Sequence, residues 1–155
     1  MSVSKNILIL GLGNLLLQDE GVGIHVVRAL EAGQAGPLPP SVQTLDGGTG
    51  GFQLVGEIQE SEHVIMIDAT LDGKPPGTVT LLEPRYASDF PPLLSAHEVG
   101  LRDMIESMML TGDVPRIHLI TISAANINEI GMELTPAVEA AIPEVIAIIK
   151  TLLNE

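Results

Sequence analysis

Cysteine is absent from the 155-residue chain. Without cysteine there is no disulfide, thiol nucleophile, iron–sulfur cluster or cysteine-ligated zinc, so any metal must be held by oxygen and histidine nitrogen. Aromatic residues make up only 2% of the chain and are limited to Phe52, Tyr86 and Phe90. This scarcity argues against base-stacking platforms for nucleic acid, and it requires a core built from aliphatic side chains and methionine.

Basic residues are also few. Seven Lys and Arg stand against 20 Asp and Glu, which gives a formal net charge of -13. Because this charge repels a phosphate backbone, nucleic acid is not expected as a partner. Apolar residues reach 45% while charged residues reach only 17%, so the composition argues against disorder. We therefore expect a single domain over residues 1–155.

No apolar run approaches the roughly 18 residues of a membrane-spanning helix. The candidate run from Ile7 to Leu17 is interrupted by two glycines and an asparagine, and Asp19 and Glu20 close it. No A-x-A cleavage site follows, so this run is interpreted as a buried strand and turn rather than a signal peptide. We expect a cytoplasmic protein with no membrane partner, and a monomer because aromatic surface anchors are absent.

Short β-rich runs alternate with longer runs of helical periodicity. The predicted strands are Asn6–Leu10, Val42–Asp46, His63–Asp68, Thr78–Glu83 and Ile117–Ile122, and the predicted helices are Glu20–Glu31, Phe52–Gln59, Ser95–Met109 and Pro136–Leu153. This alternation predicts an α/β fold of three layers, with a twisted, mostly parallel sheet of about five strands and helices on both faces. Only residues 69–77 connect the third and fourth strands, too few for a parallel crossover, so the fourth strand is expected to be an antiparallel edge strand.

Several residues predict where helices begin or end. Asp19 is a plausible N-cap for the first helix, and residues 95–98 form an S-x-x-E capping box. Thr135 precedes a proline that suits the first position of the last helix. Pro143 is expected to break or kink that helix.

Four metal-capable side chains follow the predicted strands or open a helix at the same edge of the sheet. They are Glu20, Asp46, Asp68 and His97, and open α/β sheets bind ligands beyond the carboxyl ends of their strands. Taken singly, Glu20 is favoured by the helix dipole, Asp46 can start a turn, and His97 can be solvated. Together Glu20, Asp68 and His97 form an O, O, N set that suits nickel, zinc or cadmium, either as a catalytic metal or as a metal carried by a substrate.

Other interpretations of these residues are weaker. The GLGN turn suggests a dinucleotide site, but the G-x-G-x-x-G pattern requires glycine where Leu16 stands. Asp46 and Asp68 could instead share a proton as a carboxylate pair. The remaining histidines lie inside predicted elements and are expected to be hydrogen-bonded bystanders: His25, His63 and His118.

The assembled motifs resemble those of the hydrogenase maturation endopeptidases, which process the large subunit of nickel–iron hydrogenases. The matching segments are GLGNLLLQDEGVG (11–23), LDGGTGG (45–51), MIDA (66–69), SAHEVGL (95–101) and GMELTPAVEAAIP (131–143). They follow the family's order across almost the whole chain. One departure is ITISAANI at 120–127, where the family usually has a glycine and a proline.

The resemblance implies an endopeptidase that removes a C-terminal extension from the large-subunit precursor once nickel has been inserted. It implies that Glu20, Asp68 and His97 bind metal and that Asp46 acts in substrate selection or cleavage. The nickel would be that of the precursor, so no permanent cofactor is expected. The match leaves open both metallopeptidase and aspartyl protease chemistry.

The site expected on these grounds has three parts. Asp46 and Asp68 are the expected catalytic carboxylates, and the metal trio is the one named above. The expected substrate-binding residues are those of the DGGT loop: Asp46, Gly47, Gly48 and Thr49. An alternative function is a non-catalytic chaperone that senses nickel in the precursor and holds it.

Overall fold

The computed structural model describes residues 6–48, 54–85, 89, 101–112, 114–125 and 129–154, without the side chains of residues 101–105. The strands are β1 (Ile7–Leu12), β2 (Val42–Gly48), β3 (His63–Thr70), β4 (Val79–Leu82) and β5 (Arg116–Ser123). The helices are the 3-10 turn η1 (Gln18–Gly21), α1 (Val22–Glu31), α2 (Val55–Gln59), α4 (Leu101–Thr111) and α5 (Pro136–Leu153).

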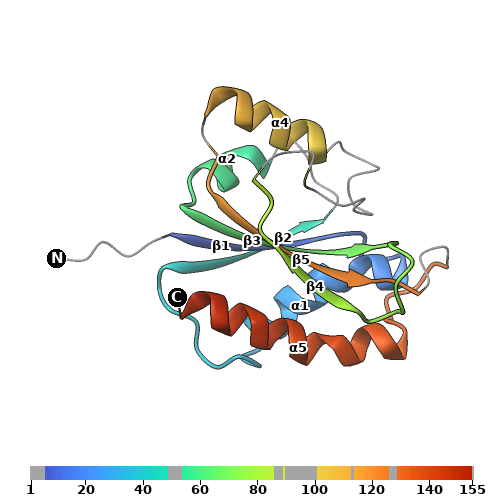
Figure 1. Ribbon diagram of the computed structural model, residues 1–155. Coiled ribbons are helices and arrows are strands. Elements are labelled where there is room, and N and C mark those ends of the chain that lie inside the picture. Colours follow the sequence, from blue (N-terminus) through green and yellow to red (C-terminus); the bar gives the residue numbers. More distant parts are fainter. Residues whose placement is uncertain are drawn as a thin grey trace.

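The strands form one sheet in the order β2-β1-β3-β5-β4 (Figure 1). The first four strands of this order are parallel to their neighbours, while β4 is antiparallel to β5 and lies at the edge. The prediction of five strands with one antiparallel edge strand is therefore confirmed. Since β1, β2, β3 and β5 are parallel, their carboxyl ends meet at one edge of the sheet.

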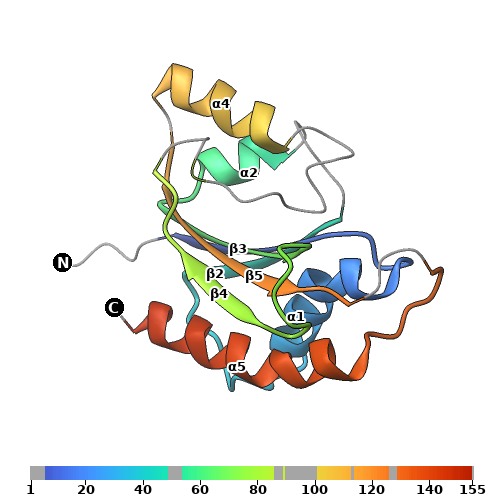
Figure 2. The same ribbon diagram turned by 45° about the vertical axis from the view of Figure 1, so that its right-hand side comes forward.

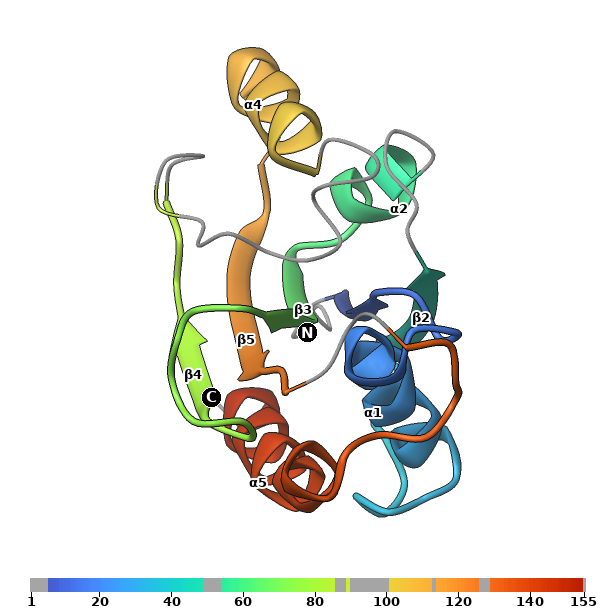
Figure 3. The ribbon, with the colours of Figure 1, turned by 90° about the vertical axis from the view of Figure 1, so that its right-hand side faces the viewer.

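Helices cover both faces of the sheet, as predicted (Figures 2 and 3). On one face, α1 and α5 pack on an aliphatic core that includes Ile65 and Ile120, both fully buried. On the other face, α2 and α4 contribute Ile58 and Met108 to a second core. No helix in the described stretches is both long enough and apolar enough to cross a bilayer.

Two expectations for the helices are corrected by the structure. Pro143 does not break the last helix, which is one element from Pro136 to Leu153, and buried residues on both sides of the proline, such as Val138 and Ile149, hold this helix against the sheet. Gly21, and not Asp19, is the N-cap of α1. The buried face of α1 is as predicted and contains Val22, Val26, Val27 and Leu30. The capping box at 95–98 lies outside the described residues.

The amino-terminal end of the sheet carries a small polar network. His63 Nε2 lies 2.7 Å from His118 Nδ1, and both rings are buried. The guanidinium of Arg116 donates to Glu83 at 3.0 Å, which lowers the pKa of that carboxyl below its usual value. These two histidines are hydrogen-bonded, as predicted, and they lie at the opposite end of β3 from Asp68.

The first turn of α1 lies directly against the ends of β1 and β3. A Cβ atom built on Gly23 would collide with the carbonyl oxygen of Ile67 and would lie 2.5 Å from that of Leu12. These are backbone atoms of the central strands and cannot swing aside. Glycine at this position therefore sets how closely the start of α1, and the turn before it, approach the sheet edge.

Substitution of Gly23 tests this close approach. We expect Gly23→Ala to lower the free energy of unfolding by about 1–3 kcal/mol, because the added methyl forces the helix away from the strands. Urea denaturation measures the change. Gly56→Ala is the matched control, since Gly56 lies in α2 and, among the described residues outside its own helix, no atom comes within 4 Å of a Cβ built on it; this substitution should be neutral or stabilising by about 0.5–1 kcal/mol. Equal effects of the two substitutions would contradict the packing argument.

Candidate functional site

The carboxyl ends of β1, β2 and β3 form the edge at which the predicted site residues lie. Gly11 of β1 pairs with Asp46 of β2 on one side and with Ile67 of β3 on the other. Asp46 is therefore in register with Ile67, the residue before Asp68, and both aspartates lie near the same edge of the sheet. The turn η1 adds Glu20 to this edge, because η1 lies between the end of β1 and the start of α1 and packs against β3.

Glu20 is positioned by a tightly folded turn. Its side chain is nearly enclosed, with the residue 6% exposed, and its amide donates to the Leu17 carbonyl at 3.1 Å. Gly13, at φ 128°, lies so close to the Glu20 carbonyl that a side chain at Gly13 would collide with it. Gln18 has the left-handed φ of 47°, an uncommon conformation for a residue other than glycine. Backbone strain of this kind clusters at functional sites.

Asp68 is the more deeply buried acid. The residue is fully enclosed at 0% exposure, and its Oδ1 accepts a hydrogen bond from the amide of Ala69 at 2.8 Å. Burial of a carboxylate is costly unless other groups compensate its charge. Two enclosed acids, Glu20 and Asp68, thus lie on adjoining elements at the ligand-binding edge of an α/β sheet, an arrangement suited to a cation.

Asp46 occupies a different environment. Its side chain is exposed, and its Oδ1 accepts a hydrogen bond from the Gly48 amide at 3.0 Å, so it organises the turn, as expected for an Asp before two glycines. Gly48 has a φ of 52°, and its carbonyl accepts from the amide of Gly13 at 2.8 Å. The DGGT loop is in this way joined to the turn that carries Glu20.

The structure does not support a proton shared between Asp46 and Asp68. The two residues lie on β2 and β3, with β1 between them, and strands are about 4.8 Å apart. Asp46 is in register with Ile67, and successive side chains of a strand point to opposite faces, so Asp46 and Asp68 leave the sheet on opposite faces. Each acid therefore has its own environment.

His97 and Thr49 lie outside the described residues, so the full metal trio and the full DGGT loop are not seen together. Within the described parts of the chain, no three His, Asp or Glu side chains are grouped so as to hold a metal. The predicted trio therefore stays a prediction, with two of its three members at the expected edge. His25 is hydrogen-bonded, as predicted, with its Nε2 lying 3.0 Å from the Met132 carbonyl oxygen.

Asp19 has a role that sequence reasoning missed. Its carboxylate is fully buried and accepts hydrogen bonds from the amides of Ala125 and Thr135, both at 2.8 Å, and from the Thr135 hydroxyl at 2.8 and 3.0 Å. Asp19 thus joins η1 to the segment after β5 and to the start of α5. The hydroxyl of Thr135, the N-cap of α5, binds Asp19 and makes no capping bond. The sequence could not reveal this role of Asp19, because an aspartate before a helix is explained equally well as an N-cap. Only the long-range contacts in the fold show it.

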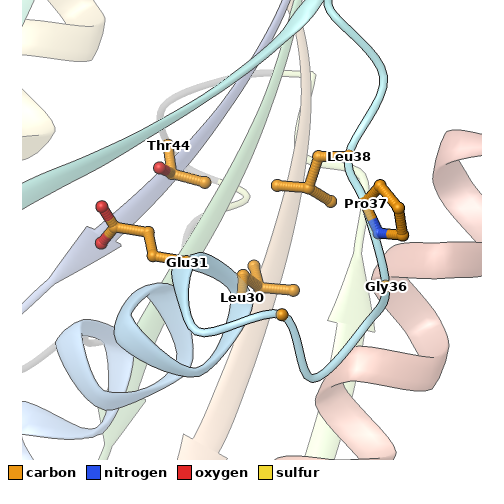
Figure 4. Close-up of a pocket in the computed structure, with 7 residues that line it drawn as sticks. Leu30, Glu31, Gly36, Pro37, Leu38 and Thr44 are labelled. Carbon is orange, nitrogen blue, oxygen red and sulfur yellow. The ribbon is translucent and has the colours of Figure 1, made fainter.

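Figure 4 shows one concavity of the described surface. It has a volume of about 530 Å³ and is lined by the end of α1 and the segment that follows, including Leu30, Glu31 and Pro37. None of the predicted site residues lines it. This concavity is therefore not part of the candidate site.

Comparison with known proteins identifies the family. A family model described as hydrogenase maturation protease matches residues 24–152. The hydrogenase 2 maturation protease of Escherichia coli K12 is 37% identical over 152 residues, covering 96% of this chain and 91% of that protein. The chain belongs to the hydrogenase maturation protease family. It is accordingly a hydrolase, an endopeptidase of hydrogenase maturation, and the dinucleotide-binding alternative is set aside.

Solved structures of the family have the same fold. The hydrogenase maturating endopeptidase HybD from E. coli superimposes with a TM-score of 0.86 at 36% identity, covering 96% of this chain and 92% of that one. The [NiFe] hydrogenase maturation protease HybD from Thermococcus kodakarensis gives 0.76 at 30% identity, with 96% and 99% covered. The mostly parallel five-stranded sheet with its antiparallel edge strand is thus the architecture of this protease family.

The carboxylate of Asp19 can be tested by a substitution that preserves its shape. Asp19→Asn keeps one acceptor oxygen but turns an amide NH₂ toward donors, so we expect the free energy of unfolding to fall by about 1.5–3 kcal/mol in urea denaturation. Thr135→Ser is the control, because it keeps both donors and should change stability by less than about 1 kcal/mol. If Asp19→Asn unfolds at the same urea concentration as the wild type, Asp19 does not stabilise the turn.

Proposed function

We propose that this protease removes the C-terminal extension of a nickel–iron hydrogenase large-subunit precursor after nickel has been inserted. The observation that carries the proposal is the pair of enclosed acids, Glu20 and Asp68, at the carboxyl edge of the family's sheet. Similarity to a hydrogenase 2 maturation protease over 96% of the chain supports the choice of substrate. The partner is then the precursor itself, with no nucleic acid and no membrane required.

Glu20, Asp68 and His97 are the proposed contacts of the precursor's nickel. Two carboxylate oxygens and one imidazole nitrogen suit a borderline divalent ion and leave coordination positions for the groups of the substrate. The nickel belongs to the substrate, and we propose no permanent cofactor. A precursor without nickel would present no cation to these buried acids, which explains how cleavage can wait for metal insertion.

The proposed chemistry is hydrolysis of the peptide bond held next to the nickel. A water attacks the carbonyl carbon and gives up a proton to a carboxylate, Asp46 or Asp68. The nickel can polarise the carbonyl or acidify the water. The tetrahedral intermediate then collapses, the carbon–nitrogen bond breaks, and the proton goes to the leaving amine. If the carboxylate alone activates the water, the protease is of the aspartyl type.

The DGGT loop, with Asp46, Gly47, Gly48 and Thr49, is the proposed contact for the polypeptide around the cleaved bond. Asp46 uses one oxygen in its own turn, and no partner of its other oxygen occurs among the described residues. That oxygen is available to the substrate or to the attacking water. The cytoplasmic location and the monomeric state stay predictions.

The decisive measurement is the intact mass of nickel-loaded and nickel-free precursor after incubation with the protease. We expect loss of a C-terminal peptide from the nickel-loaded form alone. His97→Ala should abolish this loss, because a ligand of the nickel is removed, and thermal unfolding should change little. Stable binding of the precursor with no change of mass would favour a nickel-sensing chaperone and contradict the proposal.

Glu20→Gln provides a sharper test because it keeps the side-chain volume and removes the charge. We expect the rate of processing to fall by about a hundredfold or more, as when a group that stabilises a developing charge is lost. Glu31→Gln makes the same chemical change at the exposed opposite end of α1 and should process at the wild-type rate. If Glu20→Gln still requires nickel and processes normally, Glu20 is not a ligand.

Asp46→Asn separates the two acids by function. We expect it to reduce the cleavage rate while the affinity for nickel-loaded precursor, measured by surface plasmon resonance, stays within about threefold, because the proposed nickel contacts Glu20, Asp68 and His97 are unchanged. A loss of affinity without loss of rate in the bound complex would place Asp46 in substrate selection instead.

A further inference from the structure

Two chain segments are joined beside the turn that carries Glu20. The amide of Gln18 donates to the Gly131 carbonyl at 2.8 Å, and the amide of Gly131 donates to the Leu16 carbonyl at 2.8 Å. Leu17 and Gly131 thus form an isolated parallel bridge. The Gln18 side chain lies over Gly131, with Cγ 3.4 Å from where a Cβ would stand. These contacts hold the two segments at fixed positions in the fold.

This paired region exposes large apolar side chains. Leu16 is 57% exposed, Ile130 86% and Met132 50%. Half of the six exposed large apolar side chains in the described part of the chain are therefore found on two short, directly paired segments. We name Leu16, Ile130 and Met132 the apolar ridge. Grouped apolar side chains on a soluble protein mark interaction sites, whereas single ones need no explanation.

Acidic side chains flank the ridge. Glu129 and Glu133 bracket Ile130 and Met132 in the sequence, and both are exposed. The whole chain carries a net charge of -13. A surface complementary to this one would be an apolar depression bordered by Lys or Arg side chains, because opposite charges at the rim guide association and set the orientation of the two proteins.

The ridge is continuous with the proposed catalytic edge. Asp19, next to Glu20, accepts hydrogen bonds from Thr135, so the segment that bears Ile130 and Met132 is joined to η1 at Gly131 and again at Thr135. A protein whose peptide bond reaches Glu20 therefore brings its own surface to the ridge.

The surface continues past Met132 into a groove between α1 and α5. The groove has a volume of about 430 Å³ and is lined by His25, Met132, Glu139 and Ile142, among others. His25 fixes the backbone of Met132 through its 3.0 Å contact with the carbonyl oxygen. The ridge gives a partner a raised apolar feature, and the groove gives it a recessed one with both apolar and polar side chains, as protein interfaces with good shape complementarity require.

We propose that the apolar ridge is the docking surface for the folded body of the precursor, which meets it with an apolar depression bordered by basic side chains. This inference rests on the proposed function, since it assigns a second contact to the same substrate. The ridge supplies binding energy, whereas the acids at the sheet edge supply nickel recognition and chemistry. Its loss should therefore raise KM and leave kcat nearly unchanged.

The test uses Ile130→Ser and the double variant Ile130→Ser/Met132→Ser with full-length nickel-loaded precursor. We expect affinity by surface plasmon resonance to fall about tenfold or more, with a matching rise in KM, because truncating an interface anchor has effects of this size. Leu110→Ser is the matched control, since Leu110 is 89% exposed but lies on α4 in the opposite helical layer. It should bind and process like the wild type. Unchanged affinity of the ridge variants would overturn the proposal.

Two further outcomes are distinguishable. If the wild type binds the precursor without cleaving it, the proposed function fails, while the binding experiment still tests the ridge. If sedimentation shows that the wild type dimerises and Ile130→Ser is monomeric, the ridge is a self-association surface and the proposal is overturned. The double variant Glu129→Gln/Glu133→Gln should slow association with the precursor at low salt by several-fold and reduce the salt dependence of the association rate. An unchanged association rate would show that basic side chains of the precursor do not face these two acids.

Discussion

The close contact between the first turn of α1 and the ends of β1 and β3 determines the rest of the site. Gly23 leaves no room for a methyl group between the helix and the carbonyl oxygens of Leu12 and Ile67. Because η1 directly precedes α1, the close packing at Gly23 also limits how far Glu20 can lie from the sheet edge. Asp68 follows Ile67 in β3, so one packing constraint sets the position of both enclosed acids.

Two types of interaction hold the turn around Glu20 in place. Gly13 packs its backbone against the Glu20 carbonyl on one side, and the buried carboxylate of Asp19 collects donors from Ala125 and Thr135 on the other. The same bonds connect the turn to the segment that bears the apolar ridge. The proposed docking surface and the proposed metal contacts thus lie on one connected framework.

Asp46 and Asp68 have different proposed roles because successive side chains along a strand point to opposite faces of the sheet. Asp46 and Asp68 reach the same edge from strands on either side of β1, yet they face opposite sides of the sheet. One is exposed and organises a glycine-rich loop, while the other is enclosed beside η1. Proposed substrate contact and proposed metal contact are thus separated by geometry, although both residues are aspartates near the carboxyl end of a strand.

The sequence by itself determined the fold class, the antiparallel edge strand and the edge at which Glu20, Asp46 and Asp68 lie, because strand and helix periodicity and the length of connections are local properties. It failed at Pro143, where packing on both sides of the proline keeps α5 continuous, and at Asp19, whose partners lie more than a hundred residues away. Only the tertiary structure decided the faces on which the two aspartates stand and the pairing of Leu17 with Gly131. Register and long-range hydrogen bonds arise only when distant segments meet, and no local pattern encodes them.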